Sequence, residues 1–415
     1  MSFLTLPPEL TDYIISFLRN DRRTLCACTQ VCKGWLPASR AYLFDTIRFK
    51  IPHSYTVFVE QVLGSRSMLP YLALIHGIAI VGPDGFLNQY LADKFMRDVH
   101  GNLPNLRILR ISYVDWGHLT TSDTWKYLDV NMTSPFPQLT KLAINHAVLP
   151  SDRVLTRLLV SLPCLTNLSL RSLSFRSQGT LALLENEAAP PHRSTTLGTL
   201  WIDGADDFVT PFLCWFVEQF HDARVSLREL GCTPKRWTPA SASLLEALGP
   251  APLLSTLLMP FPHRLEADVE RVSLSQLTNL TRLNVLLRGR FPTATSWADF
   301  AHMLESLGCK PRTHLSVALC YYPTTPDEWK SLDGPGLELL DPVLDQLASA
   351  SAPASMPGER PRAPAFKFVC YVHQPEHSHV RKCDVDSLVK RKLKASAERG
   401  VVSGRLMATA WSGEL

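Results

Sequence analysis

A short apolar phrase recurs along most of this chain. In each copy one leucine or isoleucine is followed three residues later by a second, and another apolar residue stands two places further on. Because alternate residues of a strand point to the same face, the second half of each phrase predicts a short strand buried on one side. The copies begin at Ile75, Leu106, Leu139, Leu165, Leu197, Leu227, Leu254 and Leu280.

The segments between the phrases carry helical periodicity. Ser151 is expected to cap one such helix, and Ser296 with Asp299 to form a capping box for another that stops at Gly308. Stacked units of this kind predict a solenoid with parallel short strands on the concave face and helices on the convex face. The copies lie 26 to 33 residues apart and mostly lack the Asn or Cys of regular leucine-rich repeats. Since those repeats usually run to roughly 20–29 residues, the array resembles an irregular leucine-rich-repeat solenoid with longer helices.

Beyond residue 310 the phrase is lost but the alternation continues. Residues 315–319 predict a ninth strand and residues 366–372 a tenth, with a helix over 337–347 between them. The segment 349–364 is rich in Pro, Ala and Ser, which favours a flexible loop. A basic stretch near the end has an apolar stripe that predicts a helix capping the solenoid, formed by Val385, Leu388, Val389 and Leu393.

The first 49 residues follow a different pattern. Apolar residues recur there at the spacing of one helical face, namely Leu10, Ile14, Phe17 and Leu18. Pro7 and Pro8 suit the start of this helix. Asp21 is placed to cap a second helix, and Pro37 to open a third. A unit of about 45 residues covers its apolar surface poorly, so the pattern predicts a partner.

These residues resemble the F-box. The resemblance rests on the strings Leu6-Pro7-Pro8-Glu9-Leu10, Val31-Cys32-Lys33-Gly34-Trp35 and Leu43-Phe44, which keep the order and spacing of that family over residues 4–49. It implies docking on the Skp-type adaptor of a cullin–RING ubiquitin ligase; the alternative is a helical cap on the chain that follows. The matching hydrophobic positions, which the resemblance leaves undivided between interface and internal packing, are Leu6, Pro7, Ile14, Leu18, Leu25, Val31, Cys32 and Trp35.

An F-box followed by repeats resembles the F-box/leucine-rich-repeat group, with a likeness to the expanded fungal F-box families. The resemblance implies the substrate-recognition subunit of an SCF-type E3 ligase, with a target protein as its second partner. A competing interpretation is a non-ligase scaffold whose F-box serves other partners. The expected α/β chain has an F-box over 1–49, a solenoid over 50–348, the loop over 349–364, and the last strands with the capping helix over 365–415.

Contacts with a target are expected from strand residues that face away from the core. The phrase assigns to that face Arg110, Lys141, Asn145, Asn167, Arg171, Trp201, Asp203, Glu229, Arg282 and Asn284. Trp201 is the expected anchor, because exposed aromatic and arginine side chains dominate interface hot spots. The mixture of charges in this row indicates no preference for an acidic or phosphorylated target.

Charge and composition further narrow the classes of protein to which the chain can belong. The 415 residues carry 42 Lys and Arg against 38 Asp and Glu, a thin excess that argues against a nucleic-acid partner. The N-terminus lacks the pattern of a secretory signal peptide, and the longest apolar stretch, 69–81, is too short to span a membrane. The ten cysteines form no Cys-x-x-Cys pair, which is typical of reduced core residues. A cytoplasmic or nuclear protein is therefore expected.

Signatures of catalysis are missing from the sequence. It contains neither a glycine-rich phosphate loop nor the patterns H-E-x-x-H and G-x-S-x-G. A third interpretation, an enzyme, would use a cluster of metal-ligand residue types formed by His373, Glu376, His377, His379 and Cys383. Their spacing matches no zinc pattern and Pro375 breaks any helix that would align them, which favours a polar loop. We expect a protein without catalytic activity, metal or cofactor.

Overall fold

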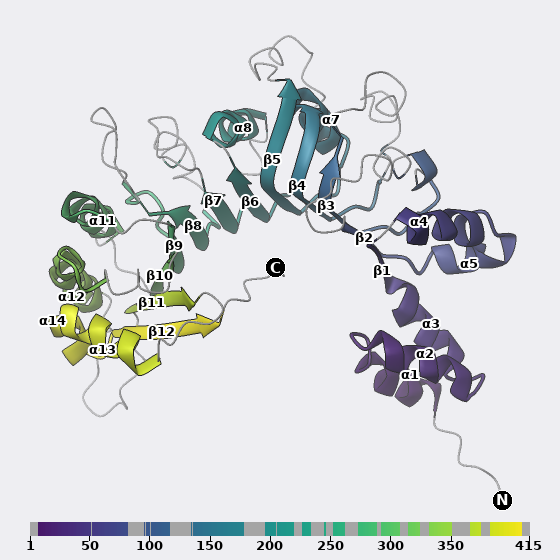
Figure 1. Ribbon diagram of the computed structural model, residues 1–415, viewed down its shortest axis with the longest axis horizontal. Helices are drawn as coiled ribbons and strands as arrows, with labels where there is room; N and C mark the ends of the chain where they lie inside the picture. The colour runs from purple at the N-terminus through teal and green to yellow at the C-terminus, as the bar shows by residue number, and fades with distance from the viewer. Residues whose placement is uncertain are drawn as a thin grey trace, which may run out of the picture. The chain divides into compact units, whose positions relative to one another are not determined.

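The computed structural model divides the chain into two compact units, residues 1–195 and 196–415. In each unit parallel strands alternate with helices, so an α/β architecture with an open sheet follows the N-terminal helices (Figure 1). The structure describes residues 7–50, 52–81, 95, 97–99, 101–116, 134, 136–177, 196–204, 206–219, 226–233, 245, 252–261, 273–288, 292–307, 314–323, 332–350, 366–374 and 382–408.

The first unit begins with the three predicted helices, α1 (Pro8–Ser16), α2 (Arg22–Val31) and α3 (Leu36–Asp45). The Asp21 carboxylate accepts a hydrogen bond of 3.1 Å from the backbone amide of Thr24, which confirms the predicted cap of α2. The three helices share a small apolar core. It consists of Ile15, Leu25 and Ala38, with the partly buried Leu18, Trp35, Tyr42 and Leu43 packed against them.

Helix α3 runs directly into β1 (Thr46–Phe49), a strand that the apolar phrase does not mark. It pairs in parallel with β2 (Gly77–Val81), so that Thr46 lies opposite Gly77. The backbone oxygen of Asp45 also accepts a hydrogen bond of 2.9 Å from the His76 amide. The helical module is therefore joined to the sheet by backbone hydrogen bonds. The connection holds α4 (Pro52–Phe58), a π-helical turn (Val59–Leu63), a 3-10 turn (Arg66–Met68) and α5 (Leu69–Leu72).

The described strands of the first unit, β1 to β5, pair in parallel and in chain order. After β2 they are β3 (Ile108–Asp115), β4 (Lys141–Ser151) and β5 (Asn167–Ser177), and α7 (Asp152–Val160) links β4 to β5. Ser151 occupies the predicted N-cap position of α7, but its side chain forms no capping hydrogen bond there. Every apolar position of the eight phrases, in both units, is buried. The predicted strands and the faces they bury are thus confirmed.

A hydroxyl group ties each of several phrases to the one before it. Thr140 and Thr166 directly follow the first leucine of their phrases, and each side chain donates to the backbone oxygen of the equivalent residue one repeat earlier, at 3.1 and 3.0 Å. Ser255 and Thr281 repeat this contact in the second unit, at 3.2 and 3.1 Å. The same carbonyl oxygens also accept backbone amides of the following repeat, as that of Arg107 does from Thr140 and Lys141, so each hydroxyl adds a side-chain bond to a backbone contact.

Three neighbouring strands carry a matching irregularity. Tyr113, His146 and Ser172 have φ angles of 58°, 49° and 50°, in the left-handed region that few non-glycine residues adopt. Each stands between two core residues that are three positions apart rather than two, as Ile111 and Val114 are in β3. One extra residue per strand, as in a β-bulge, therefore restores the core alternation. The rings of Tyr113 and His146 stack at 4.8 Å across adjacent strands.

The second unit continues the pattern with parallel strands in chain order. They are β6 (Thr199–Gly204), β7 (Glu229–Thr233), β8 (Thr256–Pro260), β9 (Arg282–Arg288), β10 (Leu315–Tyr322), β11 (Phe366–Gln374) and β12 (Val402–Ala408). Between them lie α8 (Asp206–Gln219), α11 (Ala294–Leu307), the 3-10 turn η6 (Leu337–Leu340), α12 (Asp341–Ala350), α13 (Lys382–Lys392) and α14 (Lys394–Glu398). Helix α11 packs on η6 and α12, α12 on α14, and α13 on β12 (Figure 1).

Some details differ from the sequence predictions. The capping box assigned to Ser296 is wrong, because α11 starts earlier and the hydroxyl of Thr293 accepts from the Ser296 amide at 3.4 Å. The predicted basic helix is α13, with its apolar stripe buried, but another helix and β12 follow it. Gly308 and most of the segment 349–364 lie outside the described residues.

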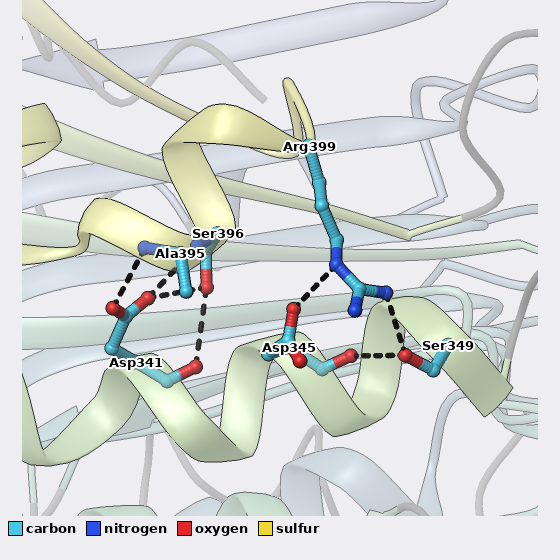
Figure 2. A network of polar contacts seen from close by, with 6 residues as sticks. All are labelled: Asp341, Asp345, Ser349, Ala395, Ser396 and Arg399. Atoms are coloured by element: carbon cyan, nitrogen blue, oxygen red, sulfur yellow. Dashed lines mark hydrogen bonds and ion pairs between the residues drawn. The ribbon is translucent and has the colours of Figure 1, made fainter.

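A polar seam fastens α12 to α14 (Figure 2). The carboxylate of Asp341 accepts hydrogen bonds of 2.9 Å from the backbone amides of Ala395 and Ser396 and one of 2.7 Å from the Ser396 hydroxyl. One turn further along α12, Asp345 pairs with Arg399 at 2.6 Å. An acidic side chain from one helix thus caps the N-terminus of the other, where unpaired amides favour negative charge.

Candidate functional site

Helix α1 leaves large apolar side chains on the surface. Phe17, directly after the helix, is 70% exposed and Tyr13 62% exposed, and their rings meet edge to face at 4.8 Å. Leu10 and Ile14 are exposed on the same side of the helix, at positions i and i+4. Val31 at the end of α2 is 60% exposed. Apolar side chains gathered on one side of a helix, as on α1, are characteristic of an interface.

The opposite side of α1 is apolar as well. Ile15 is fully buried and Leu18 packs beside it in the core of the helical module. The side chain of Thr11 is buried one turn earlier. A helix with two apolar sides in so small a module buries only one of them, and the other is left for a second surface. Helical spacing in the sequence grouped Leu18 with Leu10 and Ile14, whereas the structure places Leu18 on the buried side.

The residues expected to hold an adaptor therefore separate into two sets. Leu25, Leu18 and Trp35 are packed inside the helical module. The exposed set comprises Pro7, Ile14, Val31 and Cys32, and Leu6 lies outside the described residues. Tyr13 and Phe17 were not among the expected site residues, although their spacing from Leu10 is the signal that reveals them.

Polar contacts support the ends of these helices. The Thr24 hydroxyl and amide both donate to Asp21, and these bonds lower the pKa of its carboxyl group. The guanidinium of Arg22 donates to the backbone oxygen of Leu43 at 3.1 Å and of Thr46 at 3.3 Å. The end of α3 and the start of β1 are thereby held against the start of α2.

A second surface is formed by the strands of the first unit. We call it the outer face: the positions that alternate with the core residues in β1, in β2 and in the parts of β3, β4 and β5 that precede Tyr113, His146 and Ser172. They are Thr46, Arg48, Gly77, Ala79, Val81, Ile108, Arg110, Ser112, Lys141, Ala143, Asn145, Asn167, Ser169 and Arg171. The expected target-binding residues of the first unit all belong to it. Arg110 and Lys141 are exposed, and Asn145, Asn167 and Arg171 are half-buried.

The corresponding residues of the second unit are placed differently. Glu229 and Asn284 are half-buried and Arg282 is exposed, while Asp203 accepts a hydrogen bond of 2.8 Å from the Thr233 hydroxyl. Trp201 is only 8% exposed, so the prediction of an exposed anchor is wrong.

Trp201 is buried because its neighbour is a glycine. Gly231 lies opposite Trp201 on the next strand, and the indole covers the place that a Cβ atom there would occupy. The ring packs with Leu258 and Leu286 into an apolar cluster. An aromatic side chain laid flat against the sheet in this way contributes to packing rather than standing out toward a partner.

The cluster of possible metal ligands is described only in part. His373 is buried, its ring stacks on Tyr322 at 4.0 Å, and burial lowers the pKa of its imidazole. Glu376, His377 and His379 lie outside the described residues, as does the side chain of Cys383. Within the described part of the chain, no three residues of metal-ligand type come together. Burial raises the pKa of the Cys232, Cys320 and Cys370 thiols to about 12.

Comparison with known proteins finds one family. Residues 3–49 match the F-box-like family model, a range that covers α1, α2, α3 and β1. No curated protein matches the chain. Among the residues that the structure describes, no helix combines the length and apolar character needed to traverse a membrane.

Proposed function

We propose that this chain is the substrate-recognition subunit of an SCF-type cullin–RING E3 ubiquitin ligase. In this proposal the F-box binds a Skp-type adaptor and the strands present a surface to a target protein. The observation that carries it is the coincidence of two independent features over the same residues. The range 3–49 matches the F-box-like family model, and α1 within that range exposes Leu10, Ile14 and its neighbours.

We further propose that the parallel-strand region is an irregular leucine-rich-repeat solenoid, as in the F-box/leucine-rich-repeat group and its fungal-like families. The recurring phrase with its buried apolar positions supports this assignment. The hydroxyl contacts of Thr140, Thr166, Ser255 and Thr281 support it as well, because each links equivalent positions of successive units. Nearest-neighbour stacking of this kind is how repeat proteins are stabilised.

The chain's contribution to ubiquitin transfer would be geometric. A receptor that holds the adaptor at one end and a target elsewhere turns an encounter between separate molecules into a nearly intramolecular reaction. Direct continuation of α3 into β1, and the pairing of β1 with β2, suit this task because they fix the F-box to the first strands. Under this proposal the chain itself has no catalytic activity, metal or cofactor and works in the cytoplasm or nucleus.

Capture of a purified Skp-type adaptor by the full-length chain tests the proposal. Ile14→Asp places a charge on the exposed side of α1 and should abolish capture, since burying an unpaired carboxylate in an interface is costly. Leu253→Asp is the matched control, because Leu253, like Ile14, is an exposed aliphatic residue but lies in the second unit. Capture that survives Ile14→Asp, or that both variants lose equally, would contradict the proposal.

A non-ligase scaffold is the competing function. Such a protein would use its F-box for other partners and would not enter a ligase. Recovery of the cullin together with the adaptor from cell extract separates the two, because only the receptor brings the cullin with it. If the adaptor is recovered without the cullin, the scaffold is the better account.

A further inference from the structure

The outer face of the first unit carries one sign of charge. Its ionisable members are Arg48, Arg110, Lys141 and Arg171, and none of its positions holds Asp or Glu. The expected target-binding residues carry both signs of charge because they include Asp203 and Glu229, which belong to the second unit. The first unit therefore presents a basic surface of its own.

Three of the four basic side chains on this face are available for a ligand. Arg48, Arg110 and Lys141 are exposed and form no ion pair among the described residues. Carboxylates at the two ends of the strands are already engaged. Asp45 lies 2.9 Å from His76, and the buried Asp115 pairs with Arg176 at 2.9 Å.

The spacing of these cations follows from the sheet. Arg48 and Arg110 share one row, two strands apart through Ala79, which separates them by about 10 Å. Lys141 is on the strand next to Arg110 and two residues displaced, at about 8 Å. Gly77, Ala79, Ala143 and Ser169 lie among them, and their small side chains leave the long basic ones to form the surface.

We propose that the outer face of the first unit binds an extended acidic segment of a partner protein. Carboxylates a few residues apart in an extended chain are separated by about 7–10 Å, which matches the distances between Arg48, Arg110 and Lys141. A single phosphate would draw its cations to one point, whereas these are spread across the strands. If the chain is a substrate receptor as proposed, this segment belongs to its target.

Nucleic acid fits the same surface less well. Proteins that bind it use many phosphate contacts and are strongly basic, while this chain carries a net charge of only +4. The basic positions of the outer face are few and separated by small residues. An acidic peptide can bind to only a few cations at low salt. Each pair of opposite charges on an exposed surface contributes modestly and is weakened by salt, so such binding is weak and salt-dependent.

The test is a binding titration with a labelled peptide and the full-length chain. The probe is a peptide of about eight residues, alternating glutamate and serine, long enough to cross the described strands of this unit when extended. The same peptide with glutamine in place of glutamate and a single-stranded DNA oligomer of equal charge serve as comparison ligands. Fluorescence anisotropy at low and at physiological salt measures each affinity.

Two triple variants separate a local site from net charge. R48Q/R110Q/K141Q removes three cations of the outer face, and R19Q/R66Q/K394Q removes three exposed cations elsewhere. The first should weaken glutamate-peptide binding by about ten- to thirtyfold at low salt, and the second should leave it unchanged. Affinity should also fall as salt rises, because exposed charges are screened.

Several results would overturn this inference. The first is equal affinity for the glutamate and glutamine peptides, and the second is an equal loss of peptide affinity in both triple variants. The third is a higher affinity for the DNA oligomer than for the glutamate peptide, if R48Q/R110Q/K141Q abolishes DNA binding. Adaptor capture by the unmodified chain and by R48Q/R110Q/K141Q is a separate readout, since that variant leaves α1 untouched. Failure of the unmodified chain to capture the adaptor, with peptide binding weakened only in R48Q/R110Q/K141Q, would reject the proposed function alone. Adaptor capture by the unmodified chain, with peptide binding unchanged in R48Q/R110Q/K141Q, would reject the acidic-segment site alone.

Discussion

Replacement of Phe17 by alanine separates docking from folding within one small module. The Phe17 side chain is 70% exposed, so removing it opens little space inside the protein. Complete burial of a phenylalanine contributes about 1.5–3 kcal/mol, and the exposed part of this one offers about 1–2 kcal/mol to a partner that covers it. The dissociation constant of the adaptor complex should therefore rise by about five- to thirtyfold.

The stability of the free chain should hardly change. Loss of the edge-to-face contact with Tyr13 costs about 0.2–0.5 kcal/mol, as for other side-chain pairs on one helical face. Isothermal titration with the purified adaptor and thermal unfolding of the same samples give the two quantities. Leu253→Ala, in the second unit, is the matched control and should bind like the unmodified chain. Unchanged affinity in Phe17→Ala would refute the assignment of this side of α1 to the interface.

Three further substitutions test how the structure is held together. Leu25→Ala should destabilise the helical module by about 2–5 kcal/mol, because Leu25 is completely buried among Ile15 and Ala38; a chemical denaturation curve measures it, and a loss below 1 kcal/mol would speak against that core. Asp341→Ala should cost about 1–3 kcal/mol, since the amides of Ala395 and Ser396 lose their acceptor, while Asp341→Asn should recover part of the loss in the same thermal assay. His373→Gln should flatten the fall in melting temperature between pH 7.5 and 5.5. Burial lowers the imidazole pKa of His373 in the folded chain, so below a pH of about 6.5 the unfolded state binds a proton that the folded state does not, and this difference lowers the stability of the unmodified chain there.

Much of the fold could be predicted because its signals are local. The apolar phrase places three core residues within six positions, so each strand from β2 to β9 can be predicted from its own short stretch of sequence. The N-cap of α2 is legible for the same reason, since Asp21 and its donor Thr24 are three residues apart.

Two strands were missed because nothing local marks them. β1 has four residues, directly follows a helix, and becomes a strand by pairing with β2 some thirty residues later. β12 contains Gly404, whose amide donates to Asp386 of α13 at 2.9 Å and whose position has no room for a Cβ atom. The sequence shows a weak strand with a glycine, and only packing against α13 explains it.

The candidate surfaces, too, could be predicted from the sequence only in part. Spacing identifies α1 as apolar, but the division between its buried side, with Ile15 and Leu18, and its exposed side depends on how α2 and α3 pack against it. The burial of Trp201 depends on Gly231, thirty residues away in sequence and opposite it in the sheet. The uniform charge of the outer face becomes visible only after the chain is divided into its two units.

Hydrogen–deuterium exchange of the full-length chain, alone and with a purified Skp-type adaptor, tests the central claim most directly. The account predicts that backbone amides of α1 and of the end of α2, around Ile14 and Val31, become protected when the adaptor is added. Amides of β6 to β12 should exchange at the same rate in both samples. Unchanged exchange across residues 8–31, at adaptor concentrations that saturate known partners of that adaptor, would contradict the account.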